Sequence, residues 1–180
     1  MTNGWIMLGV ALLIAAIAAV TDTRTGRIPN WLCLPPLVLA PCFYFFNGGS
    51  LALVQSLVGI FAGGLVPYLL FRSQAAGGGD VKLLAAIGAL TGVRFSIESQ
   101  LFAYVIAAAF AICLLAVEGR LSLFLKSTLR LVAAPFVGKS RRDLYRRTQP
   151  SLTPIRLGLP IFLGVLLSAS LSLSAQGGPI

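Results

Sequence analysis

Residues Gly4 to Val20 read GWIMLGVALLIAAIAAV, an apolar run without a charged side chain. A helix needs roughly 17–25 such residues to cross the hydrocarbon core of a bilayer, so this run predicts a membrane-spanning helix. Arg24 and Arg27 follow the run and no positive charge precedes it, which is the reverse of the charge order in a secretory signal peptide. We therefore expect an anchor helix whose N-terminus lies outside the cell.

The composition extends this prediction to the whole chain. Of the 180 residues, 57% are hydrophobic and 11% are charged, whereas soluble domains carry about a quarter charged residues. A soluble globule of this length would have too few charges to cover its surface. We therefore expect an all-α, polytopic membrane protein that forms a single domain over residues 1–180.

Apolar runs of helical length recur along the chain and predict a bundle of six transmembrane helices. Their expected bounds are Gly4–Val20, Trp31–Phe46, Leu51–Phe71, Val81–Val93, Leu101–Val117 and Ile155–Leu173. The fourth run is short for a full span, at roughly 20 Å for a rise of 1.5 Å per residue. We expect it either to continue beyond Val93 or to begin below the membrane surface, which would draw Asp80 into the protein.

The basic residues predict the orientation of these helices. With both termini outside, all of the 14 Lys and Arg residues except Arg94 fall at the cytoplasmic side, where membrane proteins concentrate positive charge. The net charge of +9 therefore indicates topology, and no nucleic-acid partner is expected. In this arrangement residues 119–153 form a long cytoplasmic loop.

That loop has two parts of different character. Leu121 to Phe136 mixes leucines with Lys126 and Arg130, a pattern typical of an amphipathic helix lying on the membrane. Residues 139–147 are strongly basic, which favours attraction to anionic membrane lipid. Docking of a substrate or partner protein is the alternative role for the basic run.

The predicted topology separates the five acidic residues of the chain. Asp22 follows the first helix and Asp80 precedes the fourth, so both are expected at the cytoplasmic edge of the membrane. Glu98 falls outside, near Arg94. Glu118 and Asp143 fall in the basic cytoplasmic region, where we expect solvated ion pairs. An acid at a membrane requires a partner or a function.

For Asp22 and Asp80 the structural interpretation is a helix cap or an ion pair, and the functional one is a catalytic pair. Two carboxylates held together can share a proton, so that one activates water while the other polarises a peptide carbonyl. This chemistry needs no histidine, and the chain has none, which excludes a Ser-His-Asp triad and a His-ligated zinc site. We expect neither a metal nor a cofactor.

The glycines at 77–79, just before Asp80, allow close approach of another backbone, so an extended peptide substrate can lie there. Two other interpretations are weaker. A phosphate-binding loop would end in Gly-Lys-Ser or Gly-Lys-Thr, and none does here. No motif joins Ser73 to Lys82 as a Ser–Lys protease would require, and Lys82 is expected to anchor the helix at the membrane edge.

Two motifs in these regions resemble a known family. The sequence GGGDVKL at 77–83 matches a G-x-G-D motif with its usual continuation, and DTRTGRIPN at 22–30 is similar to a D-x5-I-P-N motif. Together they resemble the type IV prepilin peptidases, which are membrane-embedded aspartic proteases. The resemblance implies that Asp22 and Asp80 are the catalytic pair. It assigns the shaping of the two loops and of the substrate site to Gly77, Gly79, Ile28, Pro29, Asn30 and Lys82.

The resemblance also implies a substrate and a location. Such an enzyme cleaves the basic leader from a prepilin or pseudopilin at the cytoplasmic face of the bacterial inner membrane. Larger members carry an N-terminal region with paired C-x-x-C motifs and also methylate the new N-terminus. This chain begins with its first helix and resembles the short form of tight-adherence (Flp) pilus systems, so we expect a peptidase without methyltransferase activity.

Two functions of other classes remain as alternatives. The protein can be a non-catalytic scaffold subunit of a pilus or secretion assembly, in which the aspartates are caps or ion-pair partners. A proton-coupled transporter fits less well, because both acids are expected at one membrane face and not near the middle of the bilayer.

Overall fold

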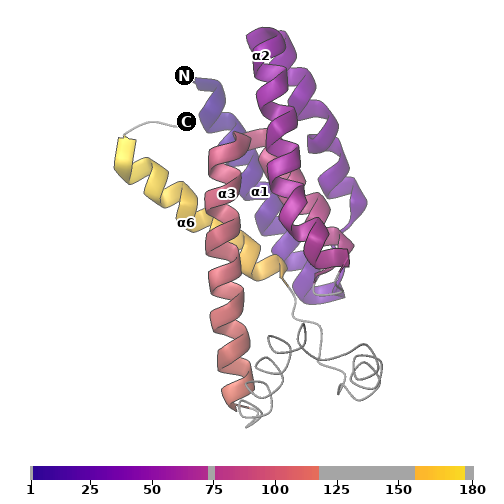
Figure 1. Ribbon diagram of the computed structural model, residues 1–180, viewed down its shortest axis with the longest axis vertical. Coiled ribbons are helices and arrows are strands. Elements are labelled where there is room, and N and C mark those ends of the chain that lie inside the picture. The colour runs from indigo at the N-terminus through magenta and orange to yellow at the C-terminus, as the bar shows by residue number, and fades with distance from the viewer. Residues whose placement is uncertain (1, 73–75, 118–156, 177–180) are drawn as a thin grey trace, which may run out of the picture. The chain divides into compact units, whose positions relative to one another are not determined.

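The computed structural model describes residues 2–72, 76–117 and 157–176, in which all the regular structure is helical. Figure 1 shows its helices: α1 (Thr2–Thr25), α2 (Asn30–Arg72), α3 (Gly78–Val117) and α6 (Gly158–Gln176). The described ranges contain no strand, so the all-α prediction is confirmed for them. The predictions for the loop at 119–153, for Glu118 and for Ser73 concern residues outside these ranges.

The chain divides into two compact units. The first comprises Met1–Ala107 and Arg156–Ile180, and it contains both Asp22 and Asp80. The second is Ala108–Ile155, of which residues 108–117 are described as the last part of α3.

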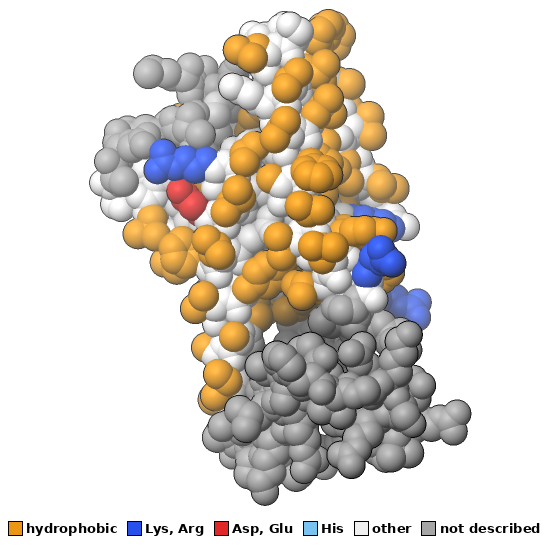
Figure 2. All heavy atoms as spheres, in the orientation of Figure 1, with side chains coloured by type: hydrophobic (Ala, Val, Ile, Leu, Met, Phe, Trp, Pro, Cys, Tyr) orange, Lys and Arg blue, Asp and Glu red, His pale blue; other side chains and the backbone are white. Residues whose placement is uncertain are grey.

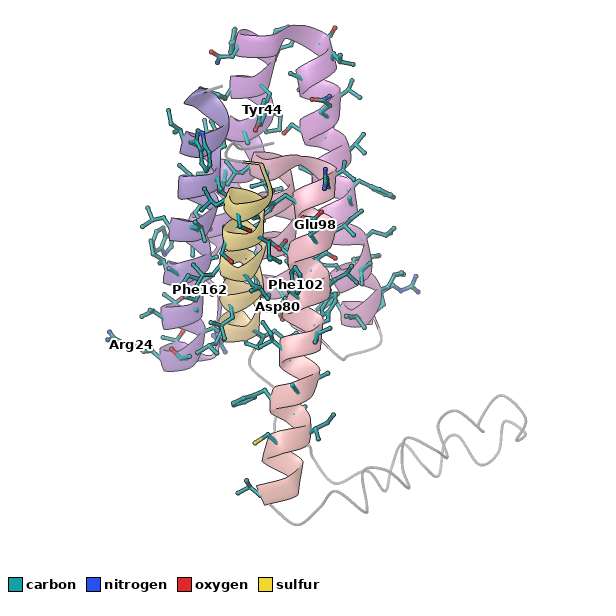
Figure 3. All side chains as sticks on the ribbon, turned by 90° about the vertical axis from the view of Figure 1, so that its left-hand side faces the viewer. Arg24, Tyr44, Asp80, Glu98, Phe102 and Phe162 are labelled. Carbon is teal, nitrogen blue, oxygen red and sulfur yellow. The ribbon has the colours of Figure 1, made fainter. Side chains whose placement is uncertain are left out.

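Two of the helices break sharply at a glycine. Gly49 in α2 has a φ of 71° and Gly92 in α3 has a φ of 79°, values that residues with a Cβ rarely adopt. The ribbon turns back on itself at each break (Figures 1 and 3). The break at Gly49 falls in the gap between the second and third apolar runs. The break at Gly92 falls within the fourth run, before its predicted end at Val93.

The surface of these helices is apolar. By length and composition α1, α2 and α3 each contain a segment able to cross a membrane, and α6 contains a shorter apolar helix, Gly158–Ser174. Hydrophobic side chains cover most of the described part of the face seen in Figure 2, and residues such as Phe46 and Leu51 are 83% and 71% exposed. Exposure of this extent is unfavourable in water, so the fold is that of a helical membrane protein.

Close contacts between backbones hold α2 against α3. Added Cβ atoms at Gly59 and Gly88 would each collide with the other residue's carbonyl oxygen, and one at Gly63 would collide with the carbonyl oxygen of Leu84. Small residues at a helix interface allow such an approach in membranes, where packing replaces the hydrophobic effect between helices. Gly164 of α6 contacts the backbone of α3 in the same way at Ala103.

Buried polar side chains reinforce the contact between α2 and α3. The Ser56 hydroxyl donates to the carbonyl oxygen of Ala89 at 2.8 Å, and the Tyr44 hydroxyl donates to that of Leu90 at 2.6 Å. The Gln100 amide donates to the carbonyl oxygen of Gly63 at 3.2 Å. Polar groups inside a membrane must find partners within the protein, so these bonds fix how α2 and α3 pair.

The helix ends near the two aspartates lie beyond the predicted bounds. α1 continues past Val20 to Thr25, because the Thr21 and Thr25 hydroxyls bond back to carbonyls of the preceding turn. It ends where Gly26, with a φ of 67°, donates its N–H to the carbonyl oxygen of Asp22 at 2.8 Å. Asp22 therefore lies in the last turn of α1, whereas the sequence predicted it after the helix.

Candidate active site

Asp22 is a buried carboxylate held by a distant part of the chain. Its side chain lies in the last turn of α1, and the residue is 7% exposed. Its Oδ2 accepts a hydrogen bond of 2.9 Å from the backbone N–H of Gly158, the first residue of α6. The first N–H groups of a helix have no partner within that helix, so Asp22 supplies one from outside.

Asp80 is the second buried carboxylate, 8% exposed. It lies in the first turn of α3, which begins at Gly78, and not before the helix as predicted. Its Oδ2 accepts the backbone N–H of Gly77 at 2.9 Å, while its own N–H donates to the carbonyl oxygen of Gly77 at 3.2 Å. In a capping box, the side chain of the third helical residue accepts the backbone N–H of the N-cap residue. Asp80 therefore caps α3 from the third helical position, with Gly77 as the N-cap, whereas the sequence suggested Asp80 itself as the cap before the helix.

The ion pairs considered for these aspartates are absent from the part of the chain that is described. Within it, the single salt bridge joins Arg94 to Glu98 at 3.1 Å, as the sequence suggested for Glu98. Arg24 and Arg27 are exposed and do not pair with Asp22. Both carboxylates are therefore held by backbone N–H groups.

Two contacts join the loop after Asp22 to the start of α3. Gly79 packs against Ile28, where an added Cβ would lie 2.9 Å from the Cβ of Ile28. The Nζ of Lys82 donates to Oδ1 of Asn30 at 2.9 Å. The two segments that carry the aspartates thus lie together. Lys82 is exposed, as expected of a residue at the membrane edge, and it binds Asn30 in addition.

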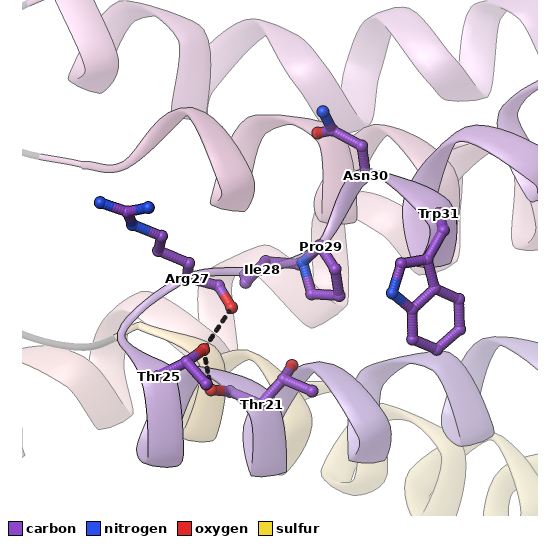
Figure 4. Close-up of a pocket in the computed structure, with 7 residues that line it drawn as sticks. All are labelled: Thr21, Thr25, Arg27, Ile28, Pro29, Asn30 and Trp31. Atoms are coloured by element: carbon purple, nitrogen blue, oxygen red, sulfur yellow. Dashed lines mark hydrogen bonds between the residues drawn. The ribbon is translucent and has the colours of Figure 1, made fainter.

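Figure 3 places Asp80 and Arg24 toward the same end of the helices, with Tyr44 toward the opposite end. An open pocket of about 460 Å³ lies along the segment that follows Asp22 (Figure 4). Its lining includes the predicted loop residues Ile28, Pro29 and Asn30 together with the exposed ring of Trp31. In that loop the Thr25 hydroxyl donates to the carbonyl oxygen of Arg27 at 3.2 Å.

Sequence reasoning identified both aspartates and the segments around them, but it did not identify Gly158. An added Cβ at Gly158 would lie 2.7 Å from the Cβ of Asp22 and 2.8 Å from its Oδ2. No local motif marks this glycine, because its partner lies 136 positions earlier. Among the described residues, no group of three or more His, Cys, Asp and Glu side chains is arranged to hold a metal ion.

The fold and the site define a class of protein: a helical membrane protein with two buried aspartates at neighbouring helix ends. Residues 9–112 match the model of the type IV leader peptidase family. The matching segment is more than half of the chain and contains Asp22 and Asp80. The chain belongs to the type IV leader peptidase family.

Individual relatives agree with this assignment. The chain is 31% identical over 100 residues to a prepilin leader peptidase/N-methyltransferase of Vibrio cholerae and 37% identical over 97 residues to one of Klebsiella pneumoniae. It is 34% identical over 101 residues to the prepilin peptidase EppA of Methanothermobacter thermautotrophicus. These alignments cover 52%, 50% and 52% of this chain, and 39%, 40% and 25% of the respective relatives. No solved structure matches the chain.

Proposed function

We propose that this protein is a membrane aspartic endopeptidase that removes the basic leader peptide from type IV prepilin-like substrates of the Flp type. The observation that carries the proposal is the pair of buried aspartates, Asp22 and Asp80, on two helix ends joined by the contact of Ile28 with Gly79. Membership of the leader peptidase family and the names of the relatives support leader cleavage.

The pair supplies the groups that peptide hydrolysis requires. One carboxylate accepts a proton from water as the water oxygen attacks the carbonyl carbon of the scissile bond, and the other, protonated, donates to the carbonyl oxygen. The C–N bond then breaks: the nitrogen takes the proton that the first carboxylate received, and the second carboxylate recovers its own. The open pocket lined by Ile28, Pro29, Asn30 and their neighbours in the loop after Asp22 offers space for substrate residues next to the bond.

The proposal includes a topology of six spans with both termini outside and the active site at the cytoplasmic face. The glycine breaks in α2 and α3 support it, since each helix then supplies two antiparallel segments besides α1 and α6. The exposed Arg24, at the same end of the helices as Asp80 (Figure 3), supports the cytoplasmic placement because cytoplasmic ends are rich in basic residues. Here an apolar substrate helix lies in the bilayer while its basic leader remains outside it.

One observation favours the alternative of a non-catalytic scaffold subunit. Both carboxylates already accept a backbone N–H at a helix start, and such a cap stabilises a helix by about 1 kcal/mol without any chemistry. In the catalytic role, removal of the negative charge abolishes leader cleavage. In the scaffold role, it alters stability or assembly and no cleavage product is at stake.

The test is leader cleavage by Asp22→Asn and Asp80→Asn in proteoliposomes, with a prepilin-like substrate that has a basic leader and an apolar helix. Asparagine keeps a carbonyl oxygen able to accept the N–H of Gly158 or Gly77, so the fold is retained while proton transfer is lost. We expect wild-type cleavage and none by either variant. Glu98→Gln, at the exposed ion pair with Arg94, is the matched control and should cleave normally. Full processing by either aspartate variant would overturn the aspartic mechanism.

A further inference from the structure

Each of the two aspartates has one oxygen bound to a backbone N–H and one oxygen left over. Oδ2 of Asp80 accepts from Gly77, directly before α3, and Oδ2 of Asp22 accepts from Gly158, at the start of α6. Among the described residues neither Oδ1 accepts a hydrogen bond from an N–H or O–H group. A bound Oδ2 fixes the rotation of the carboxylate, so the direction in which Oδ1 points is also fixed.

The donor to Asp80 is local, whereas the donor to Asp22 comes from α6. α6 packs along α1 and meets Asp22 with its first residue. Position 158 has no room for a side chain, because a Cβ there would overlap both the Cβ and Oδ2 of Asp22. A residue other than glycine would therefore displace either the start of α6 or the Asp22 side chain.

We propose that Gly158 is a positioning residue of the active site: its N–H orients Asp22 so that Oδ1 faces the reacting water, and only glycine allows α6 to come close enough. The inference rests on the proposed peptidase function. It makes α6, outside the segment that matches the family model, part of the site. A misplacement of about 1 Å near reacting groups can lower a rate by about 10²-fold, so this contact has a measurable kinetic consequence.

Two other glycines provide matched controls. Gly164 lies on the same helix and is equally crowded, since a Cβ there would lie 2.6 Å from the backbone nitrogen of Ala103, away from the carboxylates. Gly9 in α1 has no atom within 4 Å of an added Cβ. Gly164→Ala therefore reports the effect of helix crowding alone, and Gly9→Ala reports that of the methyl group alone.

The kinetic arm compares cleavage by these three alanine variants, per amount of folded protein. We expect Gly158→Ala to lower kcat by about 10²-fold with little change in KM, because the open pocket offered above as space for the substrate is lined by residues of 21–31 and not by Gly158. Gly164→Ala is expected to lower thermal stability but to keep kcat, and Gly9→Ala is expected to keep kcat without a loss of stability. A Gly158→Ala enzyme with wild-type kcat, or an equal fall in kcat for Gly164→Ala, would overturn the proposal.

A second arm needs neither activity nor a folded Gly158→Ala variant. The dipeptide Leu-Gly occurs three times in the chain, ending at Gly9, Gly158 and Gly164. Labelling leucine with ¹³C at the carbonyl and glycine with ¹⁵N therefore selects these three amide signals in an NMR spectrum of the whole protein in detergent. An N–H bound to a carboxylate makes a stronger hydrogen bond than one bound to a neutral amide.

In the Asp22→Asn variant we expect the Gly158 amide proton to move upfield while the Gly9 and Gly164 signals stay in place. An unchanged Gly158 signal, or an equal shift of all three, would overturn the contact. Absence of leader cleavage by the wild-type protein would instead contradict the proposed function, while the amide signal would still decide whether Gly158 binds Asp22.

Discussion

Gly79 and Ile28 lie so close that a Cβ atom at position 79 would be 2.9 Å from the Cβ of Ile28 and 3.3 Å from its Cγ1. The contact joins the turn before Asp80 to the loop after Asp22. It therefore sets how near the two helix ends that carry the aspartates can approach.

Gly79→Ala should separate these segments. Because the overlapping atom of Ile28 is attached directly to the backbone, the side chain cannot rotate away, and the first turn of α3 must shift. We expect a fall in kcat/KM for leader cleavage of about 10²-fold. The control is Gly64→Ala, whose Cβ would meet that of Ala85 at an ordinary 3.4 Å. Wild-type cleavage by Gly79→Ala would show that this contact does not position Asp80.

The hydrogen bond between Lys82 and Asn30 should contribute modestly to stability. A double-mutant cycle with Lys82→Met and Asn30→Ala is expected to give a coupling of about 0.5–1 kcal/mol in the free energy of unfolding in mixed micelles, since both residues are exposed. The exposed pair Arg94 and Glu98, four residues apart on α3, provides the comparison at about 0.3–0.5 kcal/mol. A coupling of zero for Lys82 and Asn30 would leave Ile28 and Gly79 as the contact that joins the segments.

The break in α3 predicts opposite effects for two glycine substitutions. An added Cβ meets no atom within 4 Å at either Gly92 or Gly9, but Gly92 has a φ of 79° while Gly9 is an interior residue of α1. Gly92→Ala should lower the free energy of unfolding by about 1–2 kcal/mol, and Gly9→Ala should raise it by up to about 1 kcal/mol. Equal effects would mean that the backbone at position 92 is not constrained.

The topology can be tested by cysteine labelling in whole cells. After replacement of Cys33, Cys42 and Cys113 by serine, Arg94→Cys should react with a membrane-impermeant maleimide from outside, whereas Arg27→Cys should react only in inside-out vesicles. The reason is that basic residues accumulate at cytoplasmic ends. The reverse pattern would place the aspartates at the outer face and contradict the proposed site of cleavage.

Much of the fold follows from local patterns. Apolar runs predicted the helices because the hydrophobic requirement for crossing a bilayer acts along a single segment. The gap between the second and third runs coincides with the break at Gly49, whereas the break at Gly92 lies within the predicted fourth run. The bounds near Asp22 were wrong, because threonine hydroxyls and the turn at Gly26 let a polar segment continue α1.

The sequence by itself determined the apolar helices, the scarcity of acids and the two motifs that contain Asp22 and Asp80. These features depend on residues close together in the chain. The tertiary structure alone decided which backbone groups hold the carboxylates and how the two segments meet, through Gly158 on Asp22 and Ile28 on Gly79. Such contacts depend on how helices distant in sequence pack together. The pattern of residues along one segment does not specify which distant residues that segment contacts.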